Sequence, residues 1–280
     1  MSVVESPPPA PAASSAVVDR YDRLDYAERW LTDAFRVLQR DPPSFSIGID
    51  VEMTRARALV AQARAAGLRL TFTSLLIRAA GLALARHPEL HQMISGTRRV
   101  HPGQVDLSLS VSNEAIAAPL LLFTDVGNKQ LPVVASELAH RVPPLRVQDT
   151  KTLADLRRWG WLIPFGFLRR LILRVLHAPL WVRRRLTGFL QITVVPTVDL
   201  PLPLLASASV ILAMGRVAER VVARGGQPVV REMVTLTCAA DHKLWDGLRA
   251  GIFLGEVVKI LEGEDLFAEV PSAPAEAAAQ

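Results

Sequence analysis

The chain has 280 residues, half of them apolar, with a mean hydropathy of +0.25 and a formal net charge of +5. This composition supports a substantial core and excludes global disorder, and the single cysteine, Cys238, excludes a disulfide framework and fits a reducing cytoplasm. Zinc-ligand spacing, a Walker A loop and a dinucleotide-binding glycine motif are absent from the sequence, so we expect neither a bound metal nor a phosphate cradle.

The two ends of the chain differ in composition from the rest. Residues 1–20 are rich in Pro, Ala and Ser and lack the apolar stretch of a secretory signal, and the last residues are again rich in Ala and Pro. We therefore expect a disordered tail at 1–20, one folded domain at 21–268, a second disordered tail at 269–280, and a cytoplasmic location.

Local patterns predict the secondary structure of the N-terminal half. Residues 45–51 alternate between apolar and polar or small side chains, which indicates a half-buried strand. A helix over 70–86, capped by Thr71 or Thr73, has an almost wholly apolar body, so we expect it to be buried on most sides. The expected elements are helices at 26–39, 54–66, 70–86 and 130–140, and strands at 45–51, 105–111 and 115–123.

The segment 157–185 interleaves tryptophan, phenylalanine and leucine with arginine. Paired arginines at its centre argue against a membrane span. An interfacial amphipathic helix, a lid, or a docking surface for a membrane or an acidic partner is physically easier. The alternative is a pair of packing helices with an arginine-rich solvent face.

After this segment the chain is dominated by strands. Strands are expected at 189–195 and 208–214, joined by a proline-rich loop at 196–203, and a long strand at 229–240 contains Cys238, which we expect to be a buried structural thiol. Apolar residues at helical spacing predict a last helix that begins near Asp246. Because strands and helices do not alternate regularly, the fold class expected is α+β with a mixed sheet.

The heptapeptide from Asp241 to Gly247 reads D-H-x-x-x-D-G and lies between the long strand and the last helix. A histidine at the end of a strand, followed one helical turn later by a carboxylate, suits a general base, since imidazole accepts a proton near neutral pH. The other interpretation is a loop histidine followed by Asp246 as the N-cap of the helix.

The stretch LTCAADHKLWDGLRAGIFLGEVVKILE resembles the C-terminal signature of the dihydrolipoamide acyltransferases of 2-oxoacid dehydrogenase complexes, whose fold is shared with chloramphenicol acetyltransferase. Lys243 stands where arginine is usual. Further blocks resemble the same family in the same order, and the likeness covers residues 44–261. These blocks are TRARALVAQARAAGLRLTFTSLLIRAAGLALARHPEL, VDLSLSVSNEAIAAPLLLFTDVGNKQL, GFLQIT and SVILAMGRV.

The resemblance implies a chloramphenicol acetyltransferase-like mixed-sheet sandwich with flanking helices. It also implies roles for three residues: His242 as the base that deprotonates the acyl acceptor, Thr193 as the hydroxyl that stabilises the oxyanion, and Asp246 as the carboxylate that holds the loop. In that family the histidine and the hydroxyl come from neighbouring subunits, so a homotrimer with interfacial sites is expected. An ordinary β-branched strand residue is the alternative for Thr193.

Three departures from the family favour a free-standing enzyme. No lipoyl or subunit-binding domain is expected before the catalytic block, the usual Asn-Pro-Pro is replaced by Leu205, Ala206 and Ser207, and 157–185 adds about thirty residues. We therefore expect an acyltransferase that uses acetyl-CoA or another acyl-CoA as co-substrate, with no covalently bound lipoyl group. The residues that bind the co-substrate are not evident.

The expected acceptor is a hydroxyl of a small or carrier-bound molecule. Stand-alone relatives in spirotetronate polyketide pathways suggest a tetronate intermediate. One alternative is a core subunit of a dehydrogenase complex that acts on lipoamide carried by another chain. Another is a non-catalytic module that binds a membrane or an acidic partner through 157–185. We do not expect nucleic acid to be a partner.

Overall fold

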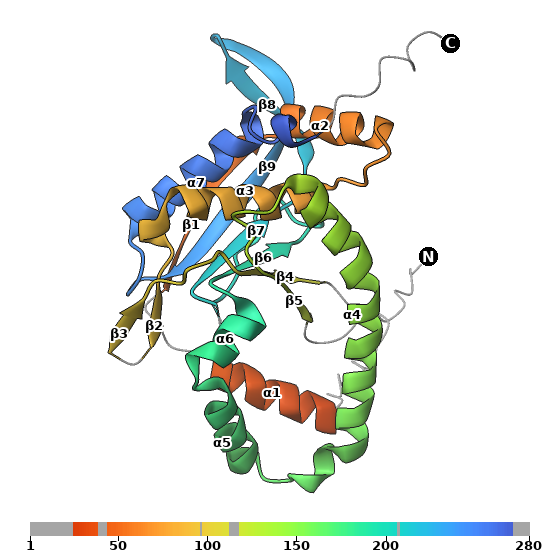
Figure 1. Cartoon of the computed structure of the whole chain (residues 1–280), viewed down its shortest axis with the longest axis vertical. Helices are drawn as coiled ribbons and strands as arrows, with labels where there is room; N and C mark the ends of the chain where they lie inside the picture. Colours follow the sequence, from red (N-terminus) through yellow and green to blue (C-terminus); the bar gives the residue numbers. More distant parts are fainter. Residues whose placement is uncertain (1–24, 39–43, 96, 112–117, 206–207, 271–280) are drawn as a thin grey trace, which may run out of the picture.

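A mixed β-sheet covered on one face by helices forms the centre of the molecule (Figure 1). The structure is a computed structural model and describes residues 25–38, 44–95, 97–111, 118–205 and 208–270. The expected tail at 1–20 and residues 271–280 of the tail expected at 269–280 lie outside the described residues. Glu269 and Val270 are described, and Glu269 ends a 3-10 helix, so the expected start of that tail was too early. The expected α+β class is confirmed by the mixed sheet and its flanking helices.

The strands pair in an order that differs from their order along the chain. Strand β6 is parallel to both of its neighbours, β4 and β7, and the other pairs are antiparallel. The sheet runs β1 (Ser44–Glu52), β9 (Gln227–Asp241), β7 (Val210–Met214), β6 (Leu190–Val194), β4 (Leu107–Ser110) and β5 (Leu120–Phe123), and β8 (Ala218–Arg224) also pairs with β9.

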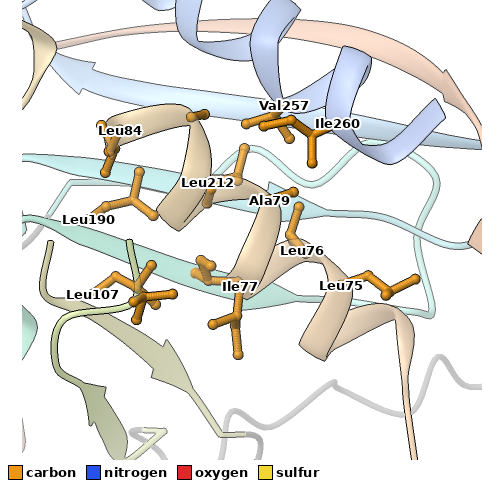
Figure 2. Packing of buried hydrophobic residues seen from close by; sticks show 14 of the residues in the cluster. Leu75, Leu76, Ile77, Ala79, Leu84, Leu107, Leu190, Leu212, Val257 and Ile260 are labelled. Carbon is orange, nitrogen blue, oxygen red and sulfur yellow. The ribbon is translucent and has the colours of Figure 1, made fainter. Parts of the chain in front are cut away.

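The core lies between this sheet and helices α3 (Phe72–Arg86) and α7 (Gly247–Glu262). Figure 2 shows α3 at its centre, with side chains such as Leu76 directed toward α7 and others toward β4, β6 and β7. The expected burial of α3 is confirmed, since ten of its residues are buried. Thr71 is its N-cap: Thr71 Oγ1 accepts from the backbone N–H of Ser74 at 3.1 Å, and Ser74 Oγ accepts from the N–H of Thr71 at 2.9 Å.

Local sequence patterns located many elements within a few residues. The expected strands β1, β6, β7 and β9 and helices α2 (Thr54–Ala65), α3 and α7 are confirmed. For the strand expected at 115–123, the structure has β5, and residues 112–117 lie outside the described part. The elements that sequence patterns missed are β8, the hairpin of β2 (Met93–Ser95) and β3 (Arg98–Val100), η1 (Pro88–Leu90) and η3 (Phe267–Glu269).

The helix expected at 130–140 is α4 (Leu131–Trp159), which is 29 residues long and continues through Pro143 and Pro144. The helix predicted at 130–140 was therefore too short. Each proline removes one backbone hydrogen bond, which frees the carbonyls of Ala139 and His140. Both prolines and His140 are exposed, so water can satisfy the backbone there and the helix continues.

A group of helices extends away from the sheet, and we call it the helical arm (Figure 1). It consists of α1 (Tyr26–Leu38), the C-terminal half of α4, η2 (Gly160–Leu162), α5 (Gly166–His177) and α6 (Leu180–Thr187).

The alternative of packing helices with an arginine-rich solvent face holds for Arg157, Arg158, Arg174 and Arg185, which are exposed, and is wrong for two other arginines of the arm. Arg169 and Arg183 are buried, while Trp161, Phe167 and Trp181 are exposed. The reason is that the arginines find partners inside the protein: Arg169 pairs with Asp33, which sequence patterns within 157–185 cannot reveal.

Candidate active site

His242 follows the last residue of β9 and is exposed to solvent. Its ring lies against Phe45 of the neighbouring strand β1, with centroids 5.1 Å apart. The turn that carries it is closed by Asp241, whose backbone carbonyl accepts from the N–H groups of Leu244 at 2.9 Å and Trp245 at 3.0 Å. The longest strand of the sheet thus ends in a hydrogen-bonded turn that leaves the imidazole accessible.

Buried side chains fix the far end of this turn. Leu244 and Trp245 are 2% and 1% exposed, and Trp245 Nε1 donates to the carbonyl of Leu90 at 2.9 Å. The indole also packs against Phe189 of the segment leading into β6 and against Phe253 of α7. The indole therefore anchors the turn to three separate parts of the core. These contacts fix the backbone that carries His242.

Asp246 is the N-cap of α7: its Oδ1 accepts from the backbone N–H of Arg249 at 2.9 Å. This hydrogen bond holds the pKa of the Asp246 carboxyl below its usual value. The N-cap interpretation of this aspartate is therefore confirmed. A carboxylate held in this way fixes the junction between the turn and α7.

Thr193 lies in β6 and is half-buried. Gly188 lies two residues before β6, and its φ of +63° and close approach to the backbone carbonyl of Asp106 leave no room for a Cβ atom. The backbone carbonyl of the adjacent, buried Thr187 accepts a hydrogen bond from the Ser108 hydroxyl at 2.9 Å. These contacts fix where β6 enters the sheet and hence the register of Thr193.

The register shows that one chain does not bring Thr193 and His242 together. Thr193 is paired with Ala213 of β7, and Ala213 is paired with Thr237 of β9. His242 lies five residues beyond Thr237, and a strand advances about 3.3 Å per residue, so the two residues are separated by about 16 Å along the sheet and by two strand spacings across it. A site that uses both side chains must draw them from two chains.

A cavity of about 440 Å³ lies at the Thr193 end of the sheet. Its walls are largely apolar and include Val194, the residue after Thr193, together with Val142 of α4. Arg69 and Arg146 add two cations to the lining. An apolar cavity with two arginines in its lining suits a ligand that has both an apolar part and phosphate groups.

A second cavity, of about 470 Å³, has a more polar lining that includes His91, His101 and Asn128. His91 is 4% exposed, and burial lowers its pKa to about 4. Among the described residues its Nε2 has no hydrogen-bond partner. The ring is therefore neutral at pH 7.

Cys238 is fully buried in β9, and burial raises the pKa of its thiol to about 12. Because the thiolate is the nucleophilic form, this cysteine is inert at neutral pH. The expectation of a structural thiol is confirmed. Within the described ranges, no cluster of three or more His, Cys, Asp or Glu side chains could hold a metal.

Comparison with known proteins identifies the family. The family model described as 2-oxoacid dehydrogenases acyltransferase (catalytic domain) matches residues 33–146 and 203–268, which together make up more than half of the chain. The chain belongs to this family. The unmatched residues between the two parts include Thr193 and most of the helical arm.

The relatives are components of multienzyme complexes. The lipoamide acyltransferase component of the branched-chain alpha-keto acid dehydrogenase complex of Bacillus subtilis is 24% identical over 200 residues, which cover 71% of this chain and 41% of that protein. The chain thus spans about two fifths of the length of the curated relatives it matches.

Solved structures show the same fold. The cubic core of the pyruvate dehydrogenase multienzyme complex has a TM-score of 0.67 at 19% identity and covers 94% of this chain and 100% of its own. The dihydrolipoamide acetyltransferase of Azotobacter vinelandii, studied for the catalytic roles of a serine, a histidine and an asparagine, has a TM-score of 0.67 at 18% identity with the same coverage. The expected acyltransferase fold is confirmed.

Proposed function

We propose that this protein transfers an acetyl or other short acyl group from acyl-CoA to a hydroxyl, with His242 as the general base. The observation that carries the proposal is the exposed His242 on an internally anchored turn, at the end of β9, in a chain of an acyltransferase family. Thr193 is the oxyanion donor and Asp246 the positioning residue. Three chains form the active unit, with a site at each interface.

In this mechanism His242 takes the proton of the acceptor O–H as the oxygen attacks the thioester carbonyl carbon. The Thr193 hydroxyl of the neighbouring chain donates a hydrogen bond to the resulting oxyanion. The C–S bond then breaks, the proton held by His242 passes to the departing sulfur, and the products are an ester and CoA. The reaction needs no metal and no oxidant.

The residue pattern supports these roles. In the Azotobacter vinelandii enzyme the asparagine under study lies four residues after the histidine, and Asp246 lies four residues after His242 here. The separation of Thr193 from His242 within one chain supports interfacial sites. The cavity beside Val194, with Arg69 and Arg146 in its lining, supports a phosphorylated thioester such as acyl-CoA as the donor.

The substitution His242→Ala in the full chain tests the proposal. The measurement is CoA release from acetyl-CoA with a panel of small primary alcohols. We expect CoA release to fall at least about 100-fold, because a general base typically contributes 10²–10⁴-fold. The matched control is His140→Ala, another exposed histidine, which should retain full activity. Unchanged turnover in His242→Ala would sink the proposed mechanism.

A second candidate is the core acyltransferase subunit of a 2-oxoacid dehydrogenase complex, acting on lipoamide carried by another chain. The names of the relatives favour it. Dihydrolipoamide belongs in the same acceptor panel, and light scattering gives the size of the assembly. Preference for dihydrolipoamide in an assembly much larger than three 30.6 kDa chains would support this candidate over the free enzyme.

The acceptor proposed first is the alcohol of a small molecule or a carrier-bound intermediate, including a polyketide tetronate. This choice is supported by the resemblance to stand-alone acyltransferases of spirotetronate pathways. The cytoplasm is the proposed location, which the single buried cysteine supports.

A further inference from the structure

Helix α5 carries two of its three arginines, Arg169 and Arg170, toward α1 and several apolar side chains toward solvent. Arg169 is 6% exposed and its Nε donates to Asp33 Oδ2 of α1 at 2.7 Å. Arg170 donates to the other oxygen of the same carboxylate at 2.9 Å. The guanidinium of Arg169 also donates to the carbonyls of Ile163 and Pro164, both at 2.9 Å. These contacts fix the rotation of α5 about its axis.

The side of α5 turned away from α1 is apolar. Phe167, Leu171 and Val175 follow one another at four-residue spacing and therefore share a face, and they are 64%, 54% and 63% exposed. The preceding turn continues this surface, because Phe165 and Phe167 have ring centroids 5.8 Å apart. We call the whole set the outer face: Trp161, Leu162, Phe165, Phe167, Leu168, Leu171 and Val175, all exposed.

An apolar surface of this kind marks a contact site, because helices of globular proteins normally bury their apolar side. Here the internal salt bridges of Arg169 and Arg170 with Asp33 prevent α5 from rotating to hide it. The outer face lies at the part of the helical arm far from the sheet (Figure 1), where the core of the domain does not cover it.

The charge of the segment that carries the outer face indicates the chemistry of what covers it. Residues 156–198 contain eight arginines and no aspartate, glutamate or lysine. Of these arginines, Arg157, Arg158, Arg174 and Arg185 are exposed, and Arg157 pairs with Asp25. Two of them lie over tryptophan rings, with the guanidinium of Arg158 5.0 Å from the centroid of Trp159 and that of Arg185 5.7 Å from that of Trp181.

Exposed aromatic and aliphatic side chains flanked by arginine are typical of helices that lie in the headgroup layer of an anionic membrane. Pairing of two outer faces from two copies of this chain is disfavoured, since both faces would carry the same positive charge. Within the described part of the chain, no helix is long and apolar enough to cross a bilayer.

We infer that the outer face docks the protein onto an anionic phospholipid surface, with Phe167, Leu171 and Val175 entering the acyl-chain boundary and Arg158, Arg174 and Arg185 contacting phosphates. The inference rests on the geometry of the arm and is independent of the proposed acyl transfer.

Vesicle flotation with the full chain tests the docking. Wild-type protein should bind vesicles that contain phosphatidylglycerol, bind pure phosphatidylcholine vesicles at least about tenfold more weakly, and lose affinity as salt rises. The triple variant Phe167→Ser, Leu171→Ser, Val175→Ser should lose binding. Arg158→Gln, Arg174→Gln, Arg185→Gln should weaken binding to anionic vesicles at least about tenfold.

The matched control is Val221→Ser with Val230→Ser, two exposed valines that face each other in the β8–β9 hairpin. It removes apolar surface elsewhere and should bind vesicles as the wild type does. Circular dichroism and thermal melting verify that each variant is folded. The inference is overturned if the wild-type protein does not bind anionic vesicles. It is also overturned if light scattering shows that the protein self-associates, that the apolar triple variant abolishes this self-association, and that vesicles do not change it.

Discussion

Trp245 is the side chain that positions His242, although the motif directs attention to the histidine and the aspartate. Its indole is fully buried and donates to the carbonyl of Leu90, so the turn between β9 and α7 cannot move independently of the core. The sequence shows a large apolar residue between the two polar residues of the motif. It does not show what the indole packs against, because Phe189 and Phe253 come from other elements.

His91 is a second residue whose behaviour depends on burial. Burial lowers the pKa of its ring from 6.5 to about 4 in the folded protein. Between these two values the unfolded chain binds a proton that the folded protein does not bind. The contribution of His91 to folding stability is therefore fully present above about pH 6.5 and is lost as the pH drops toward 4, by about 3 kcal/mol in total.

We predict that the substitution His91→Gln removes most of this pH dependence. The measurement is the free energy of unfolding in urea at pH 7 and pH 4.5. The wild type should lose about 2–3 kcal/mol more than His91→Gln between these two pH values. Equal losses in both proteins would show that His91 is not the titrating group.

At the scale of elements, an ion pair between a buried arginine and a largely buried glutamate joins three helical segments. Arg78 of α3 donates to both carboxylate oxygens of Glu269 in η3, with Nε 3.0 Å from each, and to the carbonyl of Val126 at 2.9 Å. Glu269 also accepts from the backbone N–H of Leu131 at the start of α4, at 2.6 Å. Glu269 thus fixes the C-terminal end of the fold and the origin of α4 together.

We predict that Glu269→Ala lowers the free energy of unfolding by about 3–5 kcal/mol, because it leaves the buried Arg78 charge without its partner. Chemical denaturation measures this loss. The matched control is Asp199→Ala, which breaks an ion pair with Arg216 in which both side chains are 52% exposed. That change should leave the free energy of unfolding almost unchanged, because solvent screens an exposed pair. Similar losses in the two variants would contradict the role of Glu269.

The elements also show where sequence patterns succeed. Alternation over β1 and the apolar body of α3 are properties of neighbouring residues, and both were predicted with nearly correct bounds. The length of α4 and the rotation of α5 were not predicted. They depend on solvent access at Pro143 and on a salt bridge between Arg169 and Asp33, which are 136 residues apart.

At the scale of the whole molecule, the sheet order separates the two proposed catalytic side chains. Thr193 lies in β6 and His242 follows β9, at different positions along the sheet. A chain that carries out acyl transfer with both residues must therefore act with a neighbouring copy. The proposed trimer provides this arrangement, with each interface receiving one residue from each side.

We predict that two inactive variants complement each other when they are assembled together. Thr193→Val alone should lower activity about 10²–10³-fold by removing one oxyanion donor, and His242→Ala alone should lower it at least about 100-fold. Trimers formed from an equal mixture should regain about a quarter of wild-type activity, because random mixing gives about a quarter of the interfaces both intact residues. The measurement is CoA release after co-expression.

Separately purified variants that are mixed without subunit exchange serve as the control and should stay inactive. Co-expressed variants that regain no activity, while forming trimers by light scattering, would contradict shared sites. In that outcome the oxyanion donor is another group on the same chain as His242.

The sequence by itself determined the α+β class, most strands and helices, and the D-H-x-x-x-D-G motif with His242 and Asp246. These features depend on residues close together in the chain, so periodicity and motif spacing reveal them. The tertiary structure decided the anchoring of His242 by Trp245, the distance between Thr193 and His242, and the outward apolar face of α5. Each of these results from contacts between distant segments, which form only when the sheet order and the helical arm are in place.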